Sequence, residues 1–597
     1  MTEEILLYQV TPHDPAGHRL KITLDISRPA PGGQAFYLPA WIPGSYLIRD
    51  FARQIETLQA TSHGQPVTVQ KTGNCTWQAE PVEGPLRLEY TVYAWDLSVR
   101  SAHIDESHAF FNGTSVFLAP EGQTHLPCVV ELCPPPHTSD WTVHTSLPRA
   151  EEATHAAIEY GFGRYRAPDY DALIDHPIEM GTPQTIHFDA HGARHEMVFT
   201  GVAPNLDLER IAADTKKICE AQIALFDPDT LNAPFLDSSD RYVFMTMVTG
   251  NDYGGLEHRA STALMIARRH LPVKGQPIPE GYADFLGLIS HEYFHTWHVK
   301  RIKPQAFAPY DLTTENHTRL LWVFEGFTSF YDDAMLPRAG VIAESEYLDR
   351  LARVITNVHR GPGRLKQSVA ESSFDTWTRF YKQDENSPNA LVSYYTKGSL
   401  VALGLDLLIR TQTDGNRSLD DVMRLLWQRY GRDFYQRTGA SQVGVAEAAM
   451  PALIQEATGV DVDDFISRYA YGCEDVPLQA LFADQGITLS WETDKDDNRL
   501  DVRLKNADGG CAIATAYEGG VAHAAGLSAG DHIVAVGGLR VRTDQDIVQT
   551  LGYWQPGQTV TIHVFRRDEL RHFEVTLREP EAIRCRLARE NKTPHAS

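Results

Sequence analysis

The segment Ser290–Pro304 reads S-H-E-Y-F-H-T-W-H-V-K-R-I-K-P and contains the pattern H-E-x-x-H. Its two histidines, His291 and His295, are four residues apart, so on a helix they lie on one face, one turn from each other. Both imidazoles can then bind one metal ion, and Glu292 lies beside that face, where it can take a proton from a metal-activated water. The alternative is a helix with two buried histidines satisfied by hydrogen bonds.

The sequence around this pattern favours the metal site. Residues Ala283–Ile289 are mostly apolar, and Tyr293, Phe294 and Trp297 follow, so the predicted helix is apolar most of the way round. Such a helix is buried, and burying histidine and glutamate side chains together is costly unless a partner satisfies their polar groups. A metal ion supplies that partner.

A catalytic zinc site needs a third protein ligand and an open position for water. The segment Leu321–Tyr331, L-W-V-F-E-G-F-T-S-F-Y, predicts a second apolar helix with one acid, Glu325, in its middle. A carboxylate among large apolar side chains is costly unless it is neutralised or paired, so we expect Glu325 to be the third ligand. The alternative for Glu325 is a partly exposed side chain on an amphipathic helix. Histidine and glutamate ligands favour zinc over magnesium or calcium.

Four other residues compete for the third position. Glu315, Asp332 and Asp333 are rival ligands, but each lies in a more polar part of the sequence. His298 lies seven residues after His291, and a side chain two turns along the same helix is hard to bring to one ion. We expect His298 to have a supporting or structural role.

At this point the sequence resembles the gluzincin metallopeptidases, and the aminopeptidase N family in particular, because H-E-x-x-H-x-W is followed by W-x-x-E-G-F. Asn251–His258, N-D-Y-G-G-L-E-H, resembles the G-x-M-E-N segment of those enzymes, whose glutamate binds the free amino group of the substrate. The match gives this role to Glu257. Tyr394–Gly398, Y-Y-T-K-G, resembles their Y-x-K-G segment, whose tyrosine donates a hydrogen bond to the oxyanion. That role falls to Tyr395, with Tyr394 as the alternative register.

The chain also departs from the aminopeptidase N pattern. Between His295 and Glu325 lie 29 residues, a much longer gap than in that family. The H-V-K-R-I-K-P tail, the segment Trp41–Asp50 (W-I-P-G-S-Y-L-I-R-D) and a C-terminal PDZ-like segment are not features of that family either. Together they resemble the glycyl aminopeptidase family. That resemblance implies a preference for glycine or alanine at the substrate's N-terminus.

Gly254 and Gly255 follow a predicted strand, Tyr242–Val248. Glycines there let a substrate backbone approach closely and pair with the strand edge, so we expect both to bind substrate. The alternative is a Gly-Gly turn that precedes a surface glutamate.

We expect a multidomain α+β protein. Residues 1–180 read as a β-sandwich-like domain with short strands such as Leu20–Ile26, Arg87–Tyr93, Val116–Leu118 and Trp141–Thr145. Residues 181–477 carry helical patterns, and the resemblance implies a thermolysin-like catalytic domain with a helical lobe. Residues 478–580 contain G-L-S-A-G-D-H-I-V-A-V-G-G, which resembles the PDZ signature, and residues 581–597 read as a polar tail.

Composition limits the partners. The chain has 597 residues and a formal net charge of −24, which argues against nucleic acid or an anionic membrane as a partner. The start lacks a signal-peptide pattern and no run is long enough to span a membrane, so we expect a cytoplasmic protein with reduced cysteines.

The sequence therefore predicts an aminopeptidase with one zinc ion per chain, peptide substrates, and a peptide or C-terminus as the ligand of the PDZ segment. Glu292 is the predicted general base, and Tyr395 the predicted oxyanion donor. Two alternatives stay open: a zinc endopeptidase whose PDZ segment recruits substrates, and a non-catalytic peptide-binding protein.

Overall fold

The computed structural model describes residues 4–136, 140–150, 155–437, 442–494, 497–507 and 509–589. The chain forms two compact units, each described by itself below. The first comprises Met1–Asn316, Tyr331–Ile342 and Met423–Ala446, and the second comprises His317–Phe330, Ala343–Val422 and Glu447–Ser597.

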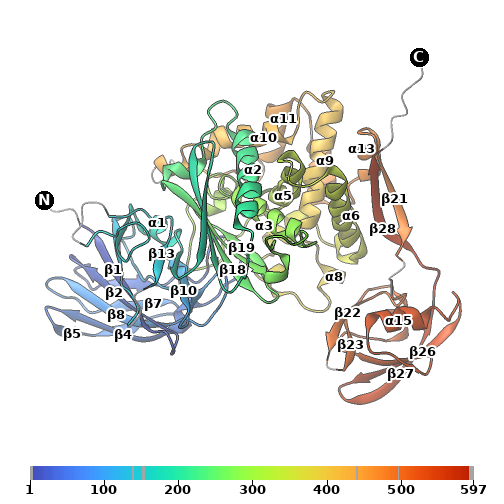
Figure 1. The fold of residues 1–597 in the computed structure, drawn as a ribbon, viewed down its shortest axis with the longest axis horizontal. Helices are drawn as coiled ribbons and strands as arrows, with labels where there is room; N and C mark the ends of the chain where they lie inside the picture. Colours follow the sequence, from blue (N-terminus) through green and yellow to red (C-terminus); the bar gives the residue numbers. More distant parts are fainter. Residues whose placement is uncertain are drawn as a thin grey trace. The chain divides into compact units, whose positions relative to one another are not determined.

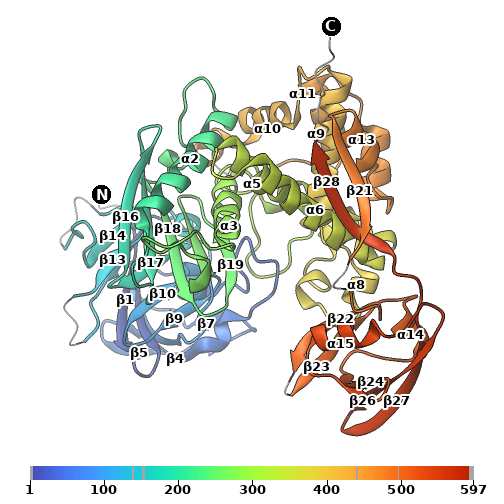
Figure 2. The same ribbon diagram turned by 45° about the vertical axis from the view of Figure 1, so that its right-hand side comes forward.

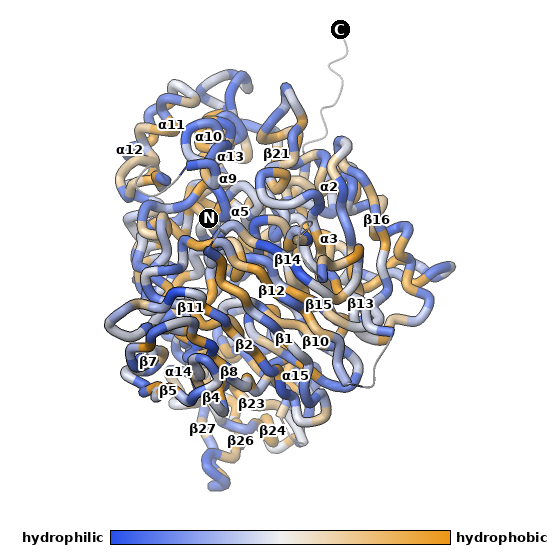
Figure 3. Tube along the Cα trace, turned by 90° about the vertical axis from the view of Figure 1, so that its left-hand side faces the viewer, coloured by the Kyte–Doolittle hydropathy of each residue, from blue (hydrophilic) through white to orange (hydrophobic). Residues whose placement is uncertain are grey.

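The first unit begins with a seven-stranded sheet, blue to cyan in Figure 1. Strand β12 (Cys128–Leu132) of this sheet is mainly hydrophobic in Figure 3. In strand β8 (Leu86–Tyr93) alternate residues from Leu86 to Val92 are buried, so one face of the sheet packs on the core. In sheet order the seven strands are β14 (Gly163–Ala167), β12 (Cys128–Leu132), β1 (Leu6–Asp14), β2 (Arg19–Ile26), β8 (Leu86–Tyr93), β4 (Ile55–Ser62) and β5 (Gln65–Val67).

Two smaller four-stranded sheets complete this β-rich part and support the predicted sandwich-like class. The first contains β13 (Thr142–His144), β15 (Ile178–Gly181), β10 (His108–Phe111) and β9 (Ala102–Ile104). The second contains β11 (Ala119–Pro120), β3 (Ala35–Tyr37), β7 (Thr76–Ala79) and β6 (Val69–Lys71).

The predicted strand Val116–Leu118 is wrong. It follows a short 3₁₀ turn, and its three backbone carbonyls accept hydrogen bonds from buried tyrosine hydroxyls instead of a neighbouring strand. The donors are Tyr90, Tyr170 and Tyr8, at 2.9, 2.7 and 2.8 Å. Side-chain hydroxyls therefore satisfy a buried irregular segment.

A five-stranded mixed sheet carries the second half of the first unit. Strands β17 (Ala193–Thr200), β18 (Arg241–Thr249) and β20 (Ser261–Ala267) are parallel, and β16 (Gln184–Ala190) and β19 (Tyr253–Glu257) are antiparallel edges. Helices α2 (Leu208–Phe226) and α3 (Tyr282–Phe294) pack against each other, and Figure 2 shows α3 beside β19.

The second unit is helical up to residue 483 and then β-rich. Its principal helices are α4 (Leu321–Phe324), α6 (Glu344–Arg360), α7 (Val369–Phe374), α9 (Thr396–Gln412), α11 (Met450–Thr458) and α13 (Leu478–Ala483). Helix α5 (Gly326–Arg338) begins in this unit and continues into the first, and so does α10 (Leu419–Leu426).

A small sheet with its own hydrophobic core follows, as expected for a PDZ domain. The sheet contains β22 (Val502–Ala507), β23 (Gly510–Ala516), β24 (His532–Val536), β25 (Leu539–Arg540), β26 (Thr559–Arg566) and β27 (Glu569–Thr576). Helices α14 (Val521–Ala525) and α15 (Asp544–Leu551) contribute to its core.

The predicted tail, residues 581–597, needs a correction. Residues Ala582–Arg589 form strand β28, which pairs antiparallel with β21 (Ile487–Thr493) and contacts α6. The backbone of Cys585 donates to Thr356 Oγ1 at 2.9 Å, so the strand is attached to the helical part of its unit. Residues 590–597 of the predicted tail lie outside the described part of the chain.

All seven cysteines are free thiols in this structure. None of the helices in the described part of the chain has the length and apolar character needed to cross a lipid bilayer.

Candidate active site

The H-E-x-x-H pattern lies at the C-terminal end of α3, which ends at Phe294, so the predicted continuation of this helix to His298 is wrong. His291 and Glu292 are in its last turn, and His295 caps it. Buried apolar residues surround the helix, so it can enter the core with this polar group at its end. The Nε2 atoms of His291 and His295 face each other at 3.1 Å.

Two acceptors orient these imidazoles. Nδ1 of His291 lies 2.9 Å from Asp332 Oδ2, and Nδ1 of His295 lies 2.8 Å from the backbone oxygen of His298. A carboxylate and a carbonyl can only accept, so each Nδ1 carries a proton, and in the neutral ring each Nε2 then carries a lone pair. Asp332, a rival ligand in the sequence, is therefore the hydrogen-bond partner of His291, and His298 supports His295 through its backbone.

This donor set fits a metal ion. Two lone pairs that face each other at 3.1 Å repel unless a cation lies between them. Two nitrogens bound at about 2.1 Å to one tetrahedral ion would be about 3.4 Å apart, close to the observed separation. Hydrogen bonds from the far side of each ring are also typical of metal-binding histidines.

Glu292 is buried and lies against the edge strand β19. A Cβ atom added to Gly255 would come within 2.2 Å of Glu292 Oε1 and 2.5 Å of its Cδ. The absence of a side chain at position 255 therefore makes room for the Glu292 carboxylate. Gly254 differs, because no heavy atom lies within 4 Å of a Cβ there.

Glu257 ends β19 and is only 3% exposed. One ligand atom each from Glu257, Glu292 and His295 lie within 4.8 Å of one another. Gly44, from the W-I-P-G-S-Y segment, lies against this carboxylate with a φ of +91°, and a Cβ there would be 2.4 Å from Glu257 Oε2. Within the described ranges, Glu257 Oε1 is buried and has no hydrogen-bond partner.

The H-V-K-R-I-K-P tail builds a buried ionic network that the sequence analysis did not foresee. Arg301 is fully buried and donates to the backbone oxygens of Thr296 and Arg259 and to Asp237. Lys300 lies 2.9 Å from Asp175. Burial lowers the pKa of Lys303 to about 7. Arg301 and Lys300 thus attach this tail to Asp237 and Asp175.

The second unit brings Glu325 close to the Y-Y-T-K-G segment. Glu325 lies between α4 and α5 and is 2% exposed. A Cβ on Gly326 would be 2.7–2.9 Å from backbone atoms of Gly398 and Tyr394. The two glycines therefore let the starts of α5 and α9 touch, which places Glu325 beside the two tyrosines.

The two tyrosines have different surroundings. The hydroxyl of Tyr394 is buried 2.8 Å from Thr376 Oγ1, and burial raises the pKa of Tyr394 well above its ordinary value. Tyr395 is half-buried, and its hydroxyl lies 3.3 Å from that of Tyr381, a residue that sequence analysis had not selected. The first tyrosine is thus engaged in the core, while the second lies at the surface of the unit.

Comparison with known proteins agrees with these features. Residues 7–182 match the Peptidase M61 N-terminal domain, residues 284–401 match M61 glycyl aminopeptidase, and residues 499–577 match a PDZ domain. The crystal structure of an aminopeptidase N family protein from Idiomarina loihiensis is 41% identical, with 98% of each chain covered and a TM-score of 0.92.

A more distant structure, an M1 zinc metallopeptidase from Deinococcus radiodurans, is 13% identical over 80% of this chain and 95% of that chain, with a TM-score of 0.46. Among curated proteins, none matches the chain significantly.

The fold and the histidine pair define a metallopeptidase with an added PDZ domain. The chain belongs to the M61 glycyl aminopeptidase family.

Proposed function

We propose that this protein is a zinc aminopeptidase that removes small N-terminal residues from peptides. The observation that carries the proposal is that the Nε2 atoms of His291 and His295 lie 3.1 Å apart, each ring oriented from its far side, with the buried Glu292 beside them. One zinc ion per chain, held by His291, His295 and Glu325, fits the types of these side chains.

The proposal that Glu325 is the third metal ligand is supported by its position along the chain relative to Asp332. Asp332, the partner of His291, lies seven residues after Glu325, and residues 326–338 form one helix. Seven residues are about two helical turns, so Glu325 is followed on the same face by the residue that orients His291. Its burial adds support, because burying a carboxylate is costly unless a partner such as a metal ion satisfies it.

When bound, zinc would supply Lewis-acid polarisation of the scissile carbonyl and lower the pKa of the attacking water. Glu292 takes the proton from that water and passes it to the leaving amine. The hydroxyl of Tyr395 donates a hydrogen bond to the oxygen on which negative charge develops. Tyr395 is favoured over Tyr394 because the Tyr394 hydroxyl is already bonded to Thr376 in the core.

Glu257 is proposed to bind the free amino group of the substrate. Its unpartnered buried oxygen suits an ammonium group, and its carboxylate lies within 4.8 Å of the Glu292 and His295 ligand atoms. An amino nitrogen is about 2.5 Å from the carbonyl carbon of its own residue, and the next carbonyl lies about 3.8 Å farther along. This spacing has room for one residue between Glu257 and the reacting centre, so cleavage follows the first residue.

A preference for glycine or alanine is consistent with the buried W-I-P-G-S-Y segment. Its Gly44 lies directly against Glu257, so the segment occupies space beside the proposed amino-group site. Gly254, where a Cβ would meet no atom, stays the proposed point of close substrate approach. Gly255 is proposed to serve the same site by making room for Glu292.

The PDZ domain is proposed to bind a peptide or a C-terminus by strand addition. The division into residues 1–180, 181–477 and 478–580 remains our proposal for the domains, and cytoplasmic location remains a prediction from the sequence. A zinc endopeptidase with PDZ-mediated recruitment is the second candidate, and the presence of the PDZ domain is the observation in its favour.

The test is hydrolysis of glycine and alanine p-nitroanilides by the full chain, with and without a zinc chelator, alongside Glu292→Gln. Chelator-sensitive release that this variant loses is the expected result. An N-acetylated peptide is the matched control, because blocking the amino group should abolish cleavage. Cleavage of the acetylated peptide alone would favour the endopeptidase. No turnover of either substrate by zinc-loaded protein would favour a peptide-binding protein.

A further inference from the structure

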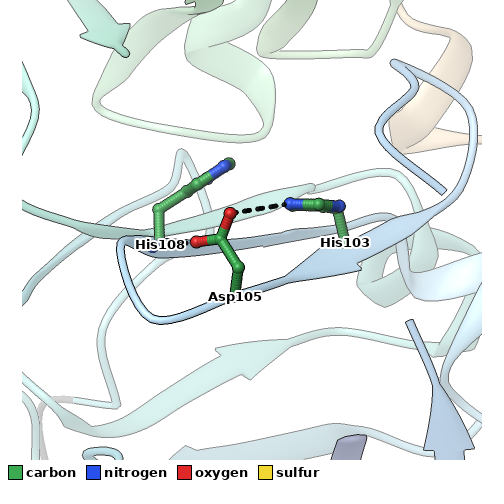
Figure 4. A group of neighbouring side chains, drawn as sticks. All are labelled: His103, Asp105 and His108. Atoms are coloured by element: carbon green, nitrogen blue, oxygen red, sulfur yellow. Dashed lines mark hydrogen bonds and ion pairs between the residues drawn. The ribbon is translucent and has the colours of Figure 1, made fainter. Parts of the chain in front are cut away.

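A second histidine and carboxylate cluster lies in the N-terminal part of the first unit, on the hairpin of β9 and β10. His103 is in β9, Asp105 begins the turn, and His108 begins β10. Residue 109 pairs with 104, so Asp105 and His108 are opposite each other, and His103 shares their face because strand side chains alternate. Figure 4 shows the cluster, with the His103 ring pointing toward the Asp105 carboxylate.

The distances suit a single ion. One ligand atom from each of the three side chains lies within 4.8 Å of the other two. His103 Nε2 and Asp105 Oδ2 are 3.3 Å apart, and the ring centroids of His103 and His108 are 5.1 Å apart. Two ligands at about 2.1 Å from one tetrahedral ion would be about 3.4 Å apart, so the first pair already has the required separation.

Neighbouring groups hold the side chains of Asp105 and His108. Asp105 Oδ1 accepts from the backbone and hydroxyl of Ser107, at 2.7 and 2.6 Å, and from the backbone of His108 at 3.1 Å. Its Oδ2 is thereby turned toward His103. Nδ1 of His108 lies 3.1 Å from Glu179 Oε1, which also accepts from Thr200 at 2.9 Å. A carboxylate on the far side of an imidazole is the usual support of a metal-binding histidine.

His103 has a ring nitrogen that makes no hydrogen bond in the described part of the chain. The residue is 3% exposed, and within the described part of the chain its Nδ1 is buried without a hydrogen-bond partner. Trp95 covers the ring at a centroid distance of 4.9 Å. Burial and the neighbouring His108 lower the pKa of His103. Despite burial, the bonds from Ser107 hold the pKa of Asp105 at about 2.

We propose that His103, Asp105 and His108 form a second metal site, separate from the H-E-x-x-H site, for a divalent transition ion such as Zn²⁺. Two imidazoles and one carboxylate select such an ion over Mg²⁺ or Ca²⁺. Glu179 acts as the positioning residue for His108. The bound ion joins the two strands of the hairpin and stabilises the folded chain by mass action.

The test uses the full chain carrying His295→Gln, which disables the H-E-x-x-H site, so that zinc bound elsewhere can be counted. After metal removal, equilibrium dialysis against Zn²⁺ should give one equivalent. Adding Asp105→Asn should weaken this binding at least 100-fold, since the amide keeps the turn but loses the anionic ligand. Adding Glu179→Gln should weaken it about 10- to 100-fold.

Asp96→Asn is the matched control, because it makes the same change at an exposed residue near the hairpin and outside the cluster. It should leave zinc binding unchanged. Zinc should raise the Tm of the His295→Gln protein and of the control, but not that of the Asp105→Asn variant. Circular dichroism checks folding, and His103→Gln replaces Asp105→Asn if that variant unfolds. Absence of a zinc equivalent in the His295→Gln protein, or equal binding by Asp105→Asn and Asp96→Asn, overturns the proposal.

Discussion

A methyl group at Gly255 would test whether this glycine positions Glu292. A Cβ there would lie 2.2, 2.5 and 2.7 Å from Oε1, Cδ and Cγ of Glu292, whereas ordinary contact begins at 3.4 Å. The carboxylate would therefore have to retreat by about 1 Å. A displacement of about 1 Å in a catalytic group costs about 100-fold in rate, or about 2.7 kcal/mol of transition-state stabilisation.

The assay is steady-state hydrolysis of glycine p-nitroanilide by Gly255→Ala, with the zinc content measured on the same preparation. We expect kcat to fall about 100-fold while zinc content is unchanged, because the methyl group is directed at the proposed base. Gly250→Ala is the control for a glycine-to-alanine change just before the same strand, since nothing lies within 4 Å of a Cβ there. It should keep wild-type kcat and KM.

Gly254→Ala separates the two roles that glycine has in this segment. No protein atom lies within 4 Å of its Cβ, so the fold accommodates alanine there, and the effect of the methyl group would fall on a substrate that pairs with this edge strand. We expect KM to rise several-fold and kcat to hold. Full activity of Gly255→Ala, or a loss of its zinc in parallel with activity, would refute the reasoning about Glu292.

Three further predictions concern orientation, the oxyanion donor and pH. Asp332→Asn should weaken zinc binding about 10- to 100-fold in a chelator competition, because it alters the hydrogen bond that orients His291; unchanged affinity would contradict this. Tyr395→Phe should lower kcat about 100- to 1000-fold, whereas Tyr394→Phe should lower the free energy of unfolding by about 1 kcal/mol and keep kcat; the reverse pattern would reassign the donor. Burial lowers the pKa of His195 to about 3 and that of His176 to about 4. Between about pH 6.5 and pH 4 these two histidines are therefore protonated in the unfolded chain but neutral in the folded chain. Because the unfolded chain binds more protons, the free energy of unfolding falls as the pH falls. Urea titrations should give a free energy of unfolding about 4 kcal/mol lower at pH 5 than at pH 7, and equal values would contradict the two assignments.

The parts of the site that depend on local spacing could be predicted from the sequence. His291, Glu292 and His295 needed only a helix, and a helix formed because apolar residues surround the motif. The partner of His291 could not be predicted, because Asp332 is 41 residues away and reaches it only in the folded chain. Similarly, strand β28 is built from polar-looking sequence that finds its partner β21 about 95 residues earlier.

The two adjacent tyrosines show a second feature of the site that could not be predicted from the sequence. Local sequence gives Tyr394 and Tyr395 nearly identical surroundings, so only the packing of Thr376 and Tyr381 distinguishes their hydroxyls. The segment Val116–Leu118 has strand-like residues, yet three tyrosines from distant elements satisfy its carbonyls. Hydrogen bonds formed in the folded chain therefore determine which tyrosine hydroxyl is free to act and whether residues 116–118 form a strand. Neither β propensity nor the alignment of a motif predicts them.

The glycines of the sequence motifs have a common physical role that pattern matching alone does not reveal. Gly44 lies against the carboxylate of Glu257, and Gly255 lies against that of Glu292, each at a distance that excludes any side chain. Gly326, next to Glu325, lies against the backbone of Gly398 in the same way. Backbone packed directly on or beside an acidic residue restricts how its side chain can turn, and a site needs such restriction to hold its charges within about 0.5 Å. Alanine at Gly255 meets only the Glu292 side chain, so it should reduce activity before it reduces folding, whereas alanine at Gly44, with its φ of +91°, or at Gly326, packed on backbone, should also reduce the free energy of unfolding.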